Sequence, residues 1–378
     1  MIPSILIFIL ILSLLVFVHE LGHFIMARKF GINVEEFGIG LPPRIWGKKI
    51  KGTIYSINLL PLGGFVKIKG EDFEGYNPKD KSNFINKKPW QKSLVLLAGI
   101  IMNLLLAVVI FYFILGLNGF KSAPILLLQD HNFPFGKAEP SPNVITFIES
   151  DSPAQKAGVQ FADKIIKMSY KEDFVYPQNV DEVRAFVENK AGEKVILDTV
   201  NINSGDKNDY TVVPVYNGDL KQPALGIALS DAVILDYNTG VDRVFAGFLH
   251  GWNITGYAIS VFGGMISASI QSRDAGIVAE GVSGPVGIFG VVRSVIESGG
   301  KRVVSTMFDL TAILSLSLGI MNLLPIPALD GGRLVFVVSE WITGKRPSQK
   351  LEARAHQIGY FLLLALLLLI TVKDIRRL

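Results

Sequence analysis

The residues best suited to chemistry lie near the start of the chain, in His19-Glu20-Leu21-Gly22-His23. On a helix the first and fifth positions share one face, so both imidazoles can reach one metal ion while Glu20 stands beside it. Zinc bound by two histidines needs a third protein ligand and keeps one position for water. Bound zinc lowers the pKa of that water toward ~7, and Glu20 can accept its proton. The spacing therefore predicts a hydrolytic zinc site.

The third zinc ligand must be a His, Asp or Glu, because the sequence contains no cysteine. The remaining histidines, His131, His250 and His356, are open candidates. Asp330 is better placed, at the end of an apolar run in the segment 322–332. Two prolines interrupt a helix there, and the two glycines after Asp330 predict a tight turn. Irregular backbone at membrane depth is tolerated where it is buried or lines a cavity.

The elements that must position these residues are membrane helices. The 378 residues are 49% hydrophobic and 19% charged, whereas soluble proteins carry about 25% charged residues. Apolar runs of roughly 20 residues can cross a bilayer, and spans are predicted at about 2–27, 94–117, 308–324 and 358–372. The stretch 244–270 also contains polar residues and glycines, which favours an interfacial or partly buried helix. Ionisable residues inside a span are costly, which favours a functional role for the zinc motif over core packing.

Charges in the loops predict an orientation. Lysine and arginine are concentrated between the first two spans and after the third, which indicates that both connections are cytoplasmic. The region 118–240 and both chain ends then lie outside the cytoplasm. A net charge of +4 without a basic stripe and interleaved aromatic residues argues against nucleic-acid binding.

Two regions of β structure are predicted outside the spans. Thr53–Leu59 alternates in polarity, and Gly63-Gly64 separates it from Phe65–Ile68, which predicts a membrane-associated β-hairpin. The edge of such a hairpin could bind an extended substrate near Gly63 and Gly64. The second region is a compact domain of strands and two short helices, with strands at 144–148, 163–168 and 194–197 and helices at 152–158 and 180–188.

Together these motifs resemble the site-2 protease family of intramembrane zinc metalloproteases, in particular its bacterial RseP-like branch. The segment N-x-x-P-x-P-x-L-D-G is similar to the second motif of that family. This resemblance implies that Asp330 is the third zinc ligand and that Asn322 and Pro325 contact the substrate. Further similarity lies in Gly38–Gly40, Pro61–Lys67 and Ser283–Gly287.

The inserted region resembles a PDZ domain through Ser152-Pro153-Ala154, Ala157-Gly158 and Asp163–Ile166. The resemblance implies a multi-pass protein of the bacterial inner (plasma) membrane with the PDZ-like domain outside the cytoplasm. That domain would restrict access to single-span membrane proteins that have already been trimmed. Anti-sigma factors and signal-peptide remnants are such substrates in related enzymes.

The expected fold is therefore a polytopic α-helical membrane protein with about four transmembrane helices, a membrane-associated β-hairpin region and an inserted α+β PDZ-like domain. Residues 1–117 form the N-terminal membrane part, with the zinc-binding helix, the hairpin and the second span. Residues 118–235 form the PDZ-like domain. Residues 236–378 form the C-terminal membrane part, with the interfacial helix and the third and fourth spans.

Two other classes of protein explain some of these features. A non-catalytic scaffold could bind chain ends through the PDZ-like domain while its zinc motif is vestigial. A metal-ion transporter could use the intramembrane histidines. Glu20 argues against the scaffold, because a structural zinc site needs no general base. The spans contain too few further polar residues for a transport path.

Overall fold

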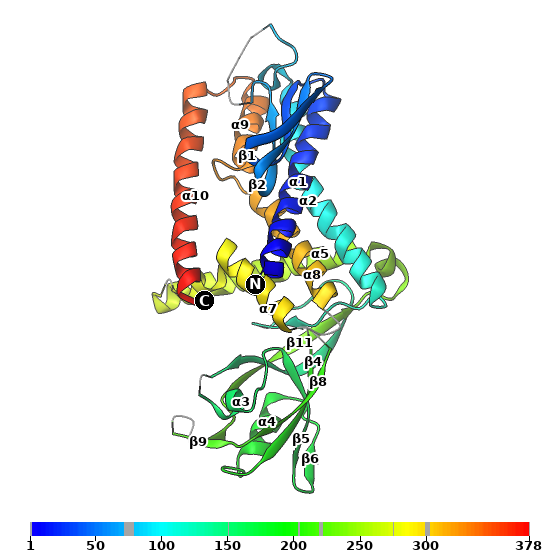
Figure 1. Ribbon diagram of the computed structural model, residues 1–378, viewed down its shortest axis with the longest axis vertical. Coiled ribbons are helices and arrows are strands. Elements are labelled where there is room, and N and C mark those ends of the chain that lie inside the picture. Colours follow the sequence, from blue (N-terminus) through cyan, green and yellow to red (C-terminus); the bar gives the residue numbers. More distant parts are fainter. Residues whose placement is uncertain are drawn as a thin grey trace. The chain divides into compact units, whose positions relative to one another are not determined.

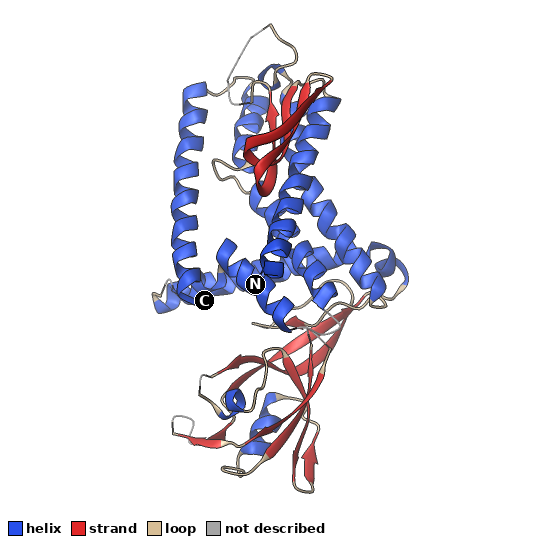
Figure 2. Ribbon diagram, in the orientation of Figure 1, coloured by secondary structure: helices blue, strands red, loops and turns tan. Residues whose placement is uncertain are grey.

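The structure is a computed structural model that describes residues 2–71, 79–149, 151–202, 205–218, 222–274, 276–298 and 303–377. Met1 and Leu378, which end the two outer predicted domains, lie outside the described residues. The chain divides into two compact units (Figures 1 and 2). Unit 1 contains Met1–Ile110, Arg273–Ser294 and Leu310–Leu378, and unit 2 contains Phe111–Ser272 and Val295–Asp309.

Four helices in the described part of the chain are long and apolar enough to cross a membrane. They are α1 (Ile2–Lys29), α2 (Pro89–Leu117), α8 (Val303–Leu323) and α10 (Gln349–Arg377). Three of them contain a predicted span, and α8 ends one residue before the predicted end at 324, which confirms four apolar helices. Helix α10 begins nine residues before the predicted start at 358, because straight-chain polar residues extend a helix without adding hydropathy.

The stretch 244–270 forms a helix, as predicted, within α5 (Gly240–Ser272). Helix α5 is not one of the four apolar helices. Three further helices in the described residues were not predicted: α6 (Gly276–Gly281), α7 (Pro285–Ser298) and α9 (Asp330–Thr343).

The β structure of unit 1 differs from the predicted hairpin. Strands β1 (Val34–Ile50) and β2 (Thr53–Ile68) are antiparallel, and each folds back so that four strand segments lie side by side. Phe37 pairs with Val66 on one side and with Tyr55 on the other. The segments 53–58 and 65–68 therefore do not pair with each other, because the first part of β1 lies between them. Glycines and prolines hide the alternation of β1 in the sequence.

Strand β2 packs along α1 through close contacts (Figure 1). The Ser13 hydroxyl donates a 2.6 Å hydrogen bond to the carbonyl of Pro61 and accepts one of 3.3 Å from the amide of Gly63. A Cβ at Gly63 would lie 2.8 Å from Val16, and the φ of Gly63 is +88°. Glycine is required there for two reasons. Other residues rarely adopt this left-handed backbone conformation, and a side chain would collide with helix α1.

The core of unit 1 packs the two strands against the apolar helices. Buried side chains from the end of α1, the turn after it, both strands, the segment before α2, α2 itself and α9 pack together. They are Ala27, Ile32, Val34, Ile68, Phe84, Val95, Leu96 and Val337. This cluster fixes the end of α1, which carries the predicted zinc motif, against α2 and α9.

The segment Ser283–Gly287 binds the end of α10. Asp374 is buried, and its carboxylate accepts hydrogen bonds of 2.8 Å from the amide of Gly284 and 2.9 Å from the amide of Gly287. These amides belong to the start of α7, whose first N–H groups have no partner within the helix. A Cβ at Gly287 would lie 2.9 Å from the Asp374 carboxylate. The glycines therefore allow a carboxylate to cap α7.

Unit 2 contains a sheet with the order β3-β11-β4-β5-β7-β8, and β6 pairs with β5. Two helices accompany it, α3 (Pro153–Lys156) and α4 (Val180–Val187). The predicted strands and helices of this region are present. The strands are β3 (Ile125–Leu126), β4 (Lys137–Ile148), β5 (Asp163–Tyr170), β6 (Asp173–Val175), β7 (Val195–Asn201), β8 (Lys207–Val212), β9 (Val215–Asn217), β10 (Gln222–Ala224) and β11 (Ile227–Asp236).

Candidate metal centre

His19, His23 and Asp330 converge in unit 1, although His19 and Asp330 are 311 residues apart in the sequence. The Nε2 atom of His19 lies 2.9 Å from Oδ2 of Asp330, and Nε2 of His23 lies 3.3 Å from the same oxygen. The two Nε2 atoms are 3.1 Å apart. Ligand atoms of a tetrahedral zinc site are separated by roughly 3.3 Å, given Zn–N bonds of about 2.0–2.1 Å. The three side chains therefore fit zinc.

Hydrogen bonding defines which atoms of His23 are available to a metal ion. Its Nδ1 lies 2.9 Å from the carbonyl oxygen of Val95. A carbonyl only accepts hydrogen bonds, so Nδ1 carries the proton and Nε2 presents a lone pair. That lone pair faces the carboxylate of Asp330, which also only accepts when it is ionised. When the imidazole is neutral, the two acceptors face each other, and a metal ion bound between them would satisfy both.

Glu20 lies between the two histidines in the sequence and is bound to strand β2. The amide of Val66 donates a 3.1 Å hydrogen bond to Oε2 of Glu20. Glu20 is partly buried, and it is not one of the three side chains whose ligand atoms converge. Glu20 is therefore next to two of the possible metal ligands in the sequence while its carboxylate is bound by the strand.

Two glycines bring α1 and α2 together at this centre. A Cβ at Gly22 would lie 2.4 Å from the backbone oxygen of Ala98. A Cβ at Gly99 would lie 2.4 Å from Nε2 of His23 and 2.9 Å from Nε2 of His19. The absence of a side chain at Gly99 therefore leaves the metal-facing nitrogens free. The sequence indicates Gly99 only as a glycine in an apolar helix, where glycine costs about 1 kcal/mol relative to alanine.

We expect Gly99→Ala to prevent zinc binding, because its methyl group would displace both metal-facing nitrogens. Zinc content of the purified protein, measured by elemental analysis, should fall from one ion per chain toward zero. Gly116→Ala on the same helix is the matched control, since a Cβ at Gly116 meets nothing within 4 Å. Equal zinc contents in the two variants would contradict the close approach at Gly99.

The backbone that leads to Asp330 differs from the predicted tight turn. Gly331 and Gly332 lie inside helix α9, which begins at Asp330, and the turn precedes Asp330. A Cβ at Gly331 would lie 2.2 Å from the carbonyl oxygen of Leu324, and one at Gly332 would lie 2.3 Å from that of Ile326. Both glycines therefore permit close packing of α9 against the preceding loop, which a sequence pattern does not distinguish from a turn.

The remaining predicted site residues lie in two places in unit 1. Asn322 belongs to the last turn of α8, and Pro325 follows that helix. Gly63 and Gly64 lie in β2 beside α1, and a Cβ at Gly64 would lie 2.8 Å from the backbone oxygen of Gly38. Among the described residues, none of these four belongs to the group formed by His19, His23 and Asp330.

The other histidines do not join the metal-binding group of the described residues. His356 accepts a 2.9 Å hydrogen bond at Nδ1 from the amide of Ala328 and so supports the loop before Asp330. His131 and His250 belong to unit 2. Nδ1 of His250 lies 3.1 Å from the hydroxyl of Tyr237. Burial lowers the pKa of His250 to about 4, so its imidazole is neutral at neutral pH.

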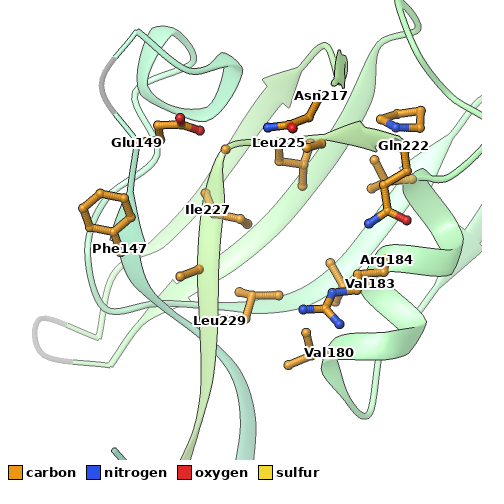
Figure 3. A pocket seen from close by; sticks show the side chains of 15 residues that line it. Phe147, Glu149, Val180, Val183, Arg184, Asn217, Gln222, Leu225, Ile227 and Leu229 are labelled. Carbon is orange, nitrogen blue, oxygen red and sulfur yellow. The ribbon is translucent and has the colours of Figure 1, made fainter. Parts of the chain in front are cut away.

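Unit 2 contains a separate groove between α4 and the start of β11 (Figure 3). Val180 and Arg184 of α4 face Ile227 and Leu229 of β11 across a cavity of about 340 Å³. This part of β11 pairs with β4 on one side. Among the described residues, β3 covers the other side of β11 only at Ala232 and its neighbour.

The site combines two imidazoles and a carboxylate that fit zinc with a separate glutamate. This is the arrangement of a zinc-dependent metallopeptidase. The chain belongs to peptidase family M50, the site-2 protease family, whose model matches residues 7–366. It is therefore a zinc-dependent protease of the site-2 type.

Curated relatives support the same class of enzyme. The chain is 32% identical to a protein of Clostridium acetobutylicum named "Putative zinc metalloprotease", over 98% of this chain and 97% of the relative. A protein of Fusobacterium nucleatum with the same descriptive name is 30% identical over 99% of this chain and 98% of its own length. One from Staphylococcus aureus is 28% identical over 99% and 98%.

Proposed function

We propose that this protease hydrolyses peptide bonds of single-span membrane proteins within the bilayer. The observation that carries the proposal is the position of the metal-binding group. His19 and His23 are buried side chains of α1, a helix long and apolar enough to cross a membrane. A substrate must reach this depth, and membrane-spanning segments are the peptides that lie there.

In this proposal, His19, His23 and Asp330 hold zinc and Glu20 is the general base. Zinc, when bound, polarises the scissile carbonyl and acidifies a water molecule. Glu20 accepts the proton of that water and passes it to the nitrogen of the leaving amine. The Val66 amide orients the Glu20 carboxylate through the 3.1 Å hydrogen bond.

A substrate helix must unwind before hydrolysis, because its carbonyl groups are hydrogen-bonded within the helix. We propose that the unwound segment extends along residues 65–68 of β2. This segment pairs with β1 on one side, and a cavity of about 310 Å³ is lined by Phe65, Val66, Lys67 and Ile68. Backbone hydrogen bonds to a strand edge bind extended peptides of many sequences. Gly63, Gly64, Asn322 and Pro325 are the further proposed substrate contacts.

We propose that residues 118–235 form a PDZ-like domain outside the cytoplasm, between membrane parts 1–117 and 236–378. The groove between α4 and β11 supports this proposal, because peptides commonly bind between a helix and a strand edge (Figure 3). The loop charges support the orientation in a bacterial inner membrane. The domain would admit single-span proteins whose outer part has been trimmed, such as anti-sigma factors or signal-peptide remnants.

Cleavage of a single-span reporter by the purified protein in detergent tests the proposed function. We expect cleavage by the zinc-loaded protein, loss of cleavage after a chelator has removed zinc, and recovery when zinc is restored. Elemental analysis should accompany each step. Cleavage by protein shown to be free of zinc would exclude this mechanism. A zinc-loaded protein that leaves several trimmed reporters intact would favour the non-catalytic scaffold.

A further inference from the structure

Helix α2 supplies the groups that surround the metal-facing histidines. Val95, Gly99 and Asn103 are spaced by four residues and therefore lie on one face of α2. The carbonyl of Val95 accepts a hydrogen bond from His23 Nδ1, and the bare Cα of Gly99 faces both histidines. Asn103 completes the row next to His19: its side-chain nitrogen lies 3.2 Å from Nδ1 of His19. One helix face thus contacts both imidazoles.

Zinc binding by His19 determines whether Asn103 must be a hydrogen-bond donor or acceptor toward its Nδ1. The Nε2 atom of His19 faces Asp330 at 2.9 Å and His23 at 3.1 Å. If Nε2 binds zinc through its lone pair, the proton of the neutral imidazole must be on Nδ1. That Nδ1–H group needs an acceptor, and the side-chain NH₂ of Asn103 only donates.

A half-turn of the Asn103 amide removes this conflict. The amide exchanges its oxygen and nitrogen without changing its shape. Asn103 is fully buried, and its Oδ1 has no partner among the described residues, so no hydrogen bond at that atom holds the amide in the orientation with NH₂ toward His19. The exchange places Oδ1 at the acceptor position for His19 Nδ1–H. The backbone of Asn103 is fixed independently, because its carbonyl accepts a 2.8 Å hydrogen bond from the Ser315 hydroxyl.

We propose that Asn103 is a positioning residue that fixes the tautomer and orientation of His19 by accepting a hydrogen bond from its Nδ1. This inference rests on the proposed zinc site. Asn103 does for His19 what the Val95 carbonyl does for His23, so both ligands keep Nε2 directed at the metal. Partners of this kind usually contribute about 10–100-fold to metal affinity.

The test is the zinc affinity of variants in detergent, measured by competition with a chromophoric chelator. We expect Asn103→Leu, which has no acceptor, to weaken zinc binding by about 10–100-fold. Asn103→Asp keeps an acceptor oxygen and should bind zinc about as tightly as the wild type. Ser315→Ala is the matched control, because it removes a hydrogen bond to the Asn103 backbone but leaves the amide in place.

A second measurement separates positioning from loss of packing. The visible spectrum of the cobalt-substituted protein reports ligand geometry, and we expect it to change in Asn103→Leu and to be restored in Asn103→Asp. Equal affinity and spectra for Asn103→Leu and the wild type would overturn the inference. So would an equal loss in all three variants, which would indicate packing alone. A wild-type protein that binds no zinc would instead overturn the proposed function, and this inference with it.

Discussion

Glu20→Gln is expected to reduce the rate of reporter cleavage by about 10²- to 10⁴-fold, the usual contribution of a general acid–base group. Glutamine has nearly the shape of glutamate, and its oxygen can still accept the hydrogen bond from the Val66 amide. It cannot accept the proton of water. The loss should therefore appear in the rate of cleavage while the structure of the centre is kept.

The control for this prediction is the zinc content of the same protein preparation. Because Glu20 is not part of the converging ligand set, Glu20→Gln should retain one zinc ion per chain. A variant that cleaves the reporter at the wild-type rate would refute the role of Glu20. That result would mean that another group accepts the proton of water during cleavage.

Asp330→Ala is expected to abolish both zinc retention and cleavage. The substitution removes the carboxylate that lies within 2.9 Å and 3.3 Å of the two histidine nitrogens. Losing one of three protein ligands should cost more than the about 10–100-fold effect of losing a partner that only orients a ligand. Zinc remaining after dialysis, measured by elemental analysis, should be close to zero.

His356→Ala provides a discriminating comparison, because His356 is the rival third ligand in the same unit. Its Nδ1 accepts a hydrogen bond from the backbone near Asp330, so the variant perturbs the same loop. We expect His356→Ala to retain zinc. Retention by Asp330→Ala together with loss in His356→Ala would reverse the assignment of the third ligand.

Features that depend on neighbours in the sequence were predictable. The four apolar helices follow from continuous apolar runs, and the shared face of His19 and His23 follows from the helical repeat. The alternation of Thr53–Leu59 predicted a strand for the same reason. The predicted pairing of that strand with residues 65–68 was wrong, because the strand segment that contains Phe37 lies between the two. Alternation predicts a strand but not which strands are adjacent.

Features that depend on close approach between distant segments could not be predicted. Gly99 lies in a run of apolar residues, and the motif around Gly331 predicted a turn instead of close packing. Each glycine is required because another backbone or an imidazole lies where its Cβ would be. The partner of His23 is the carbonyl of Val95, a group that every residue possesses. The sequence favoured Asp330 over the other candidates through two prolines, and its place beside the histidines depends on how α9 packs.

The distance along the chain between the metal ligands has a consequence for assembly. A single ion held by His19 on α1 and Asp330 on α9 would act as a cross-link that closes a loop of more than three hundred residues, since the two residues are 311 apart. Closing a loop becomes only slowly more costly as it lengthens, by about 0.6 kcal/mol for each doubling. The region between the ligands can therefore gain or lose length while the ion still joins the two ends.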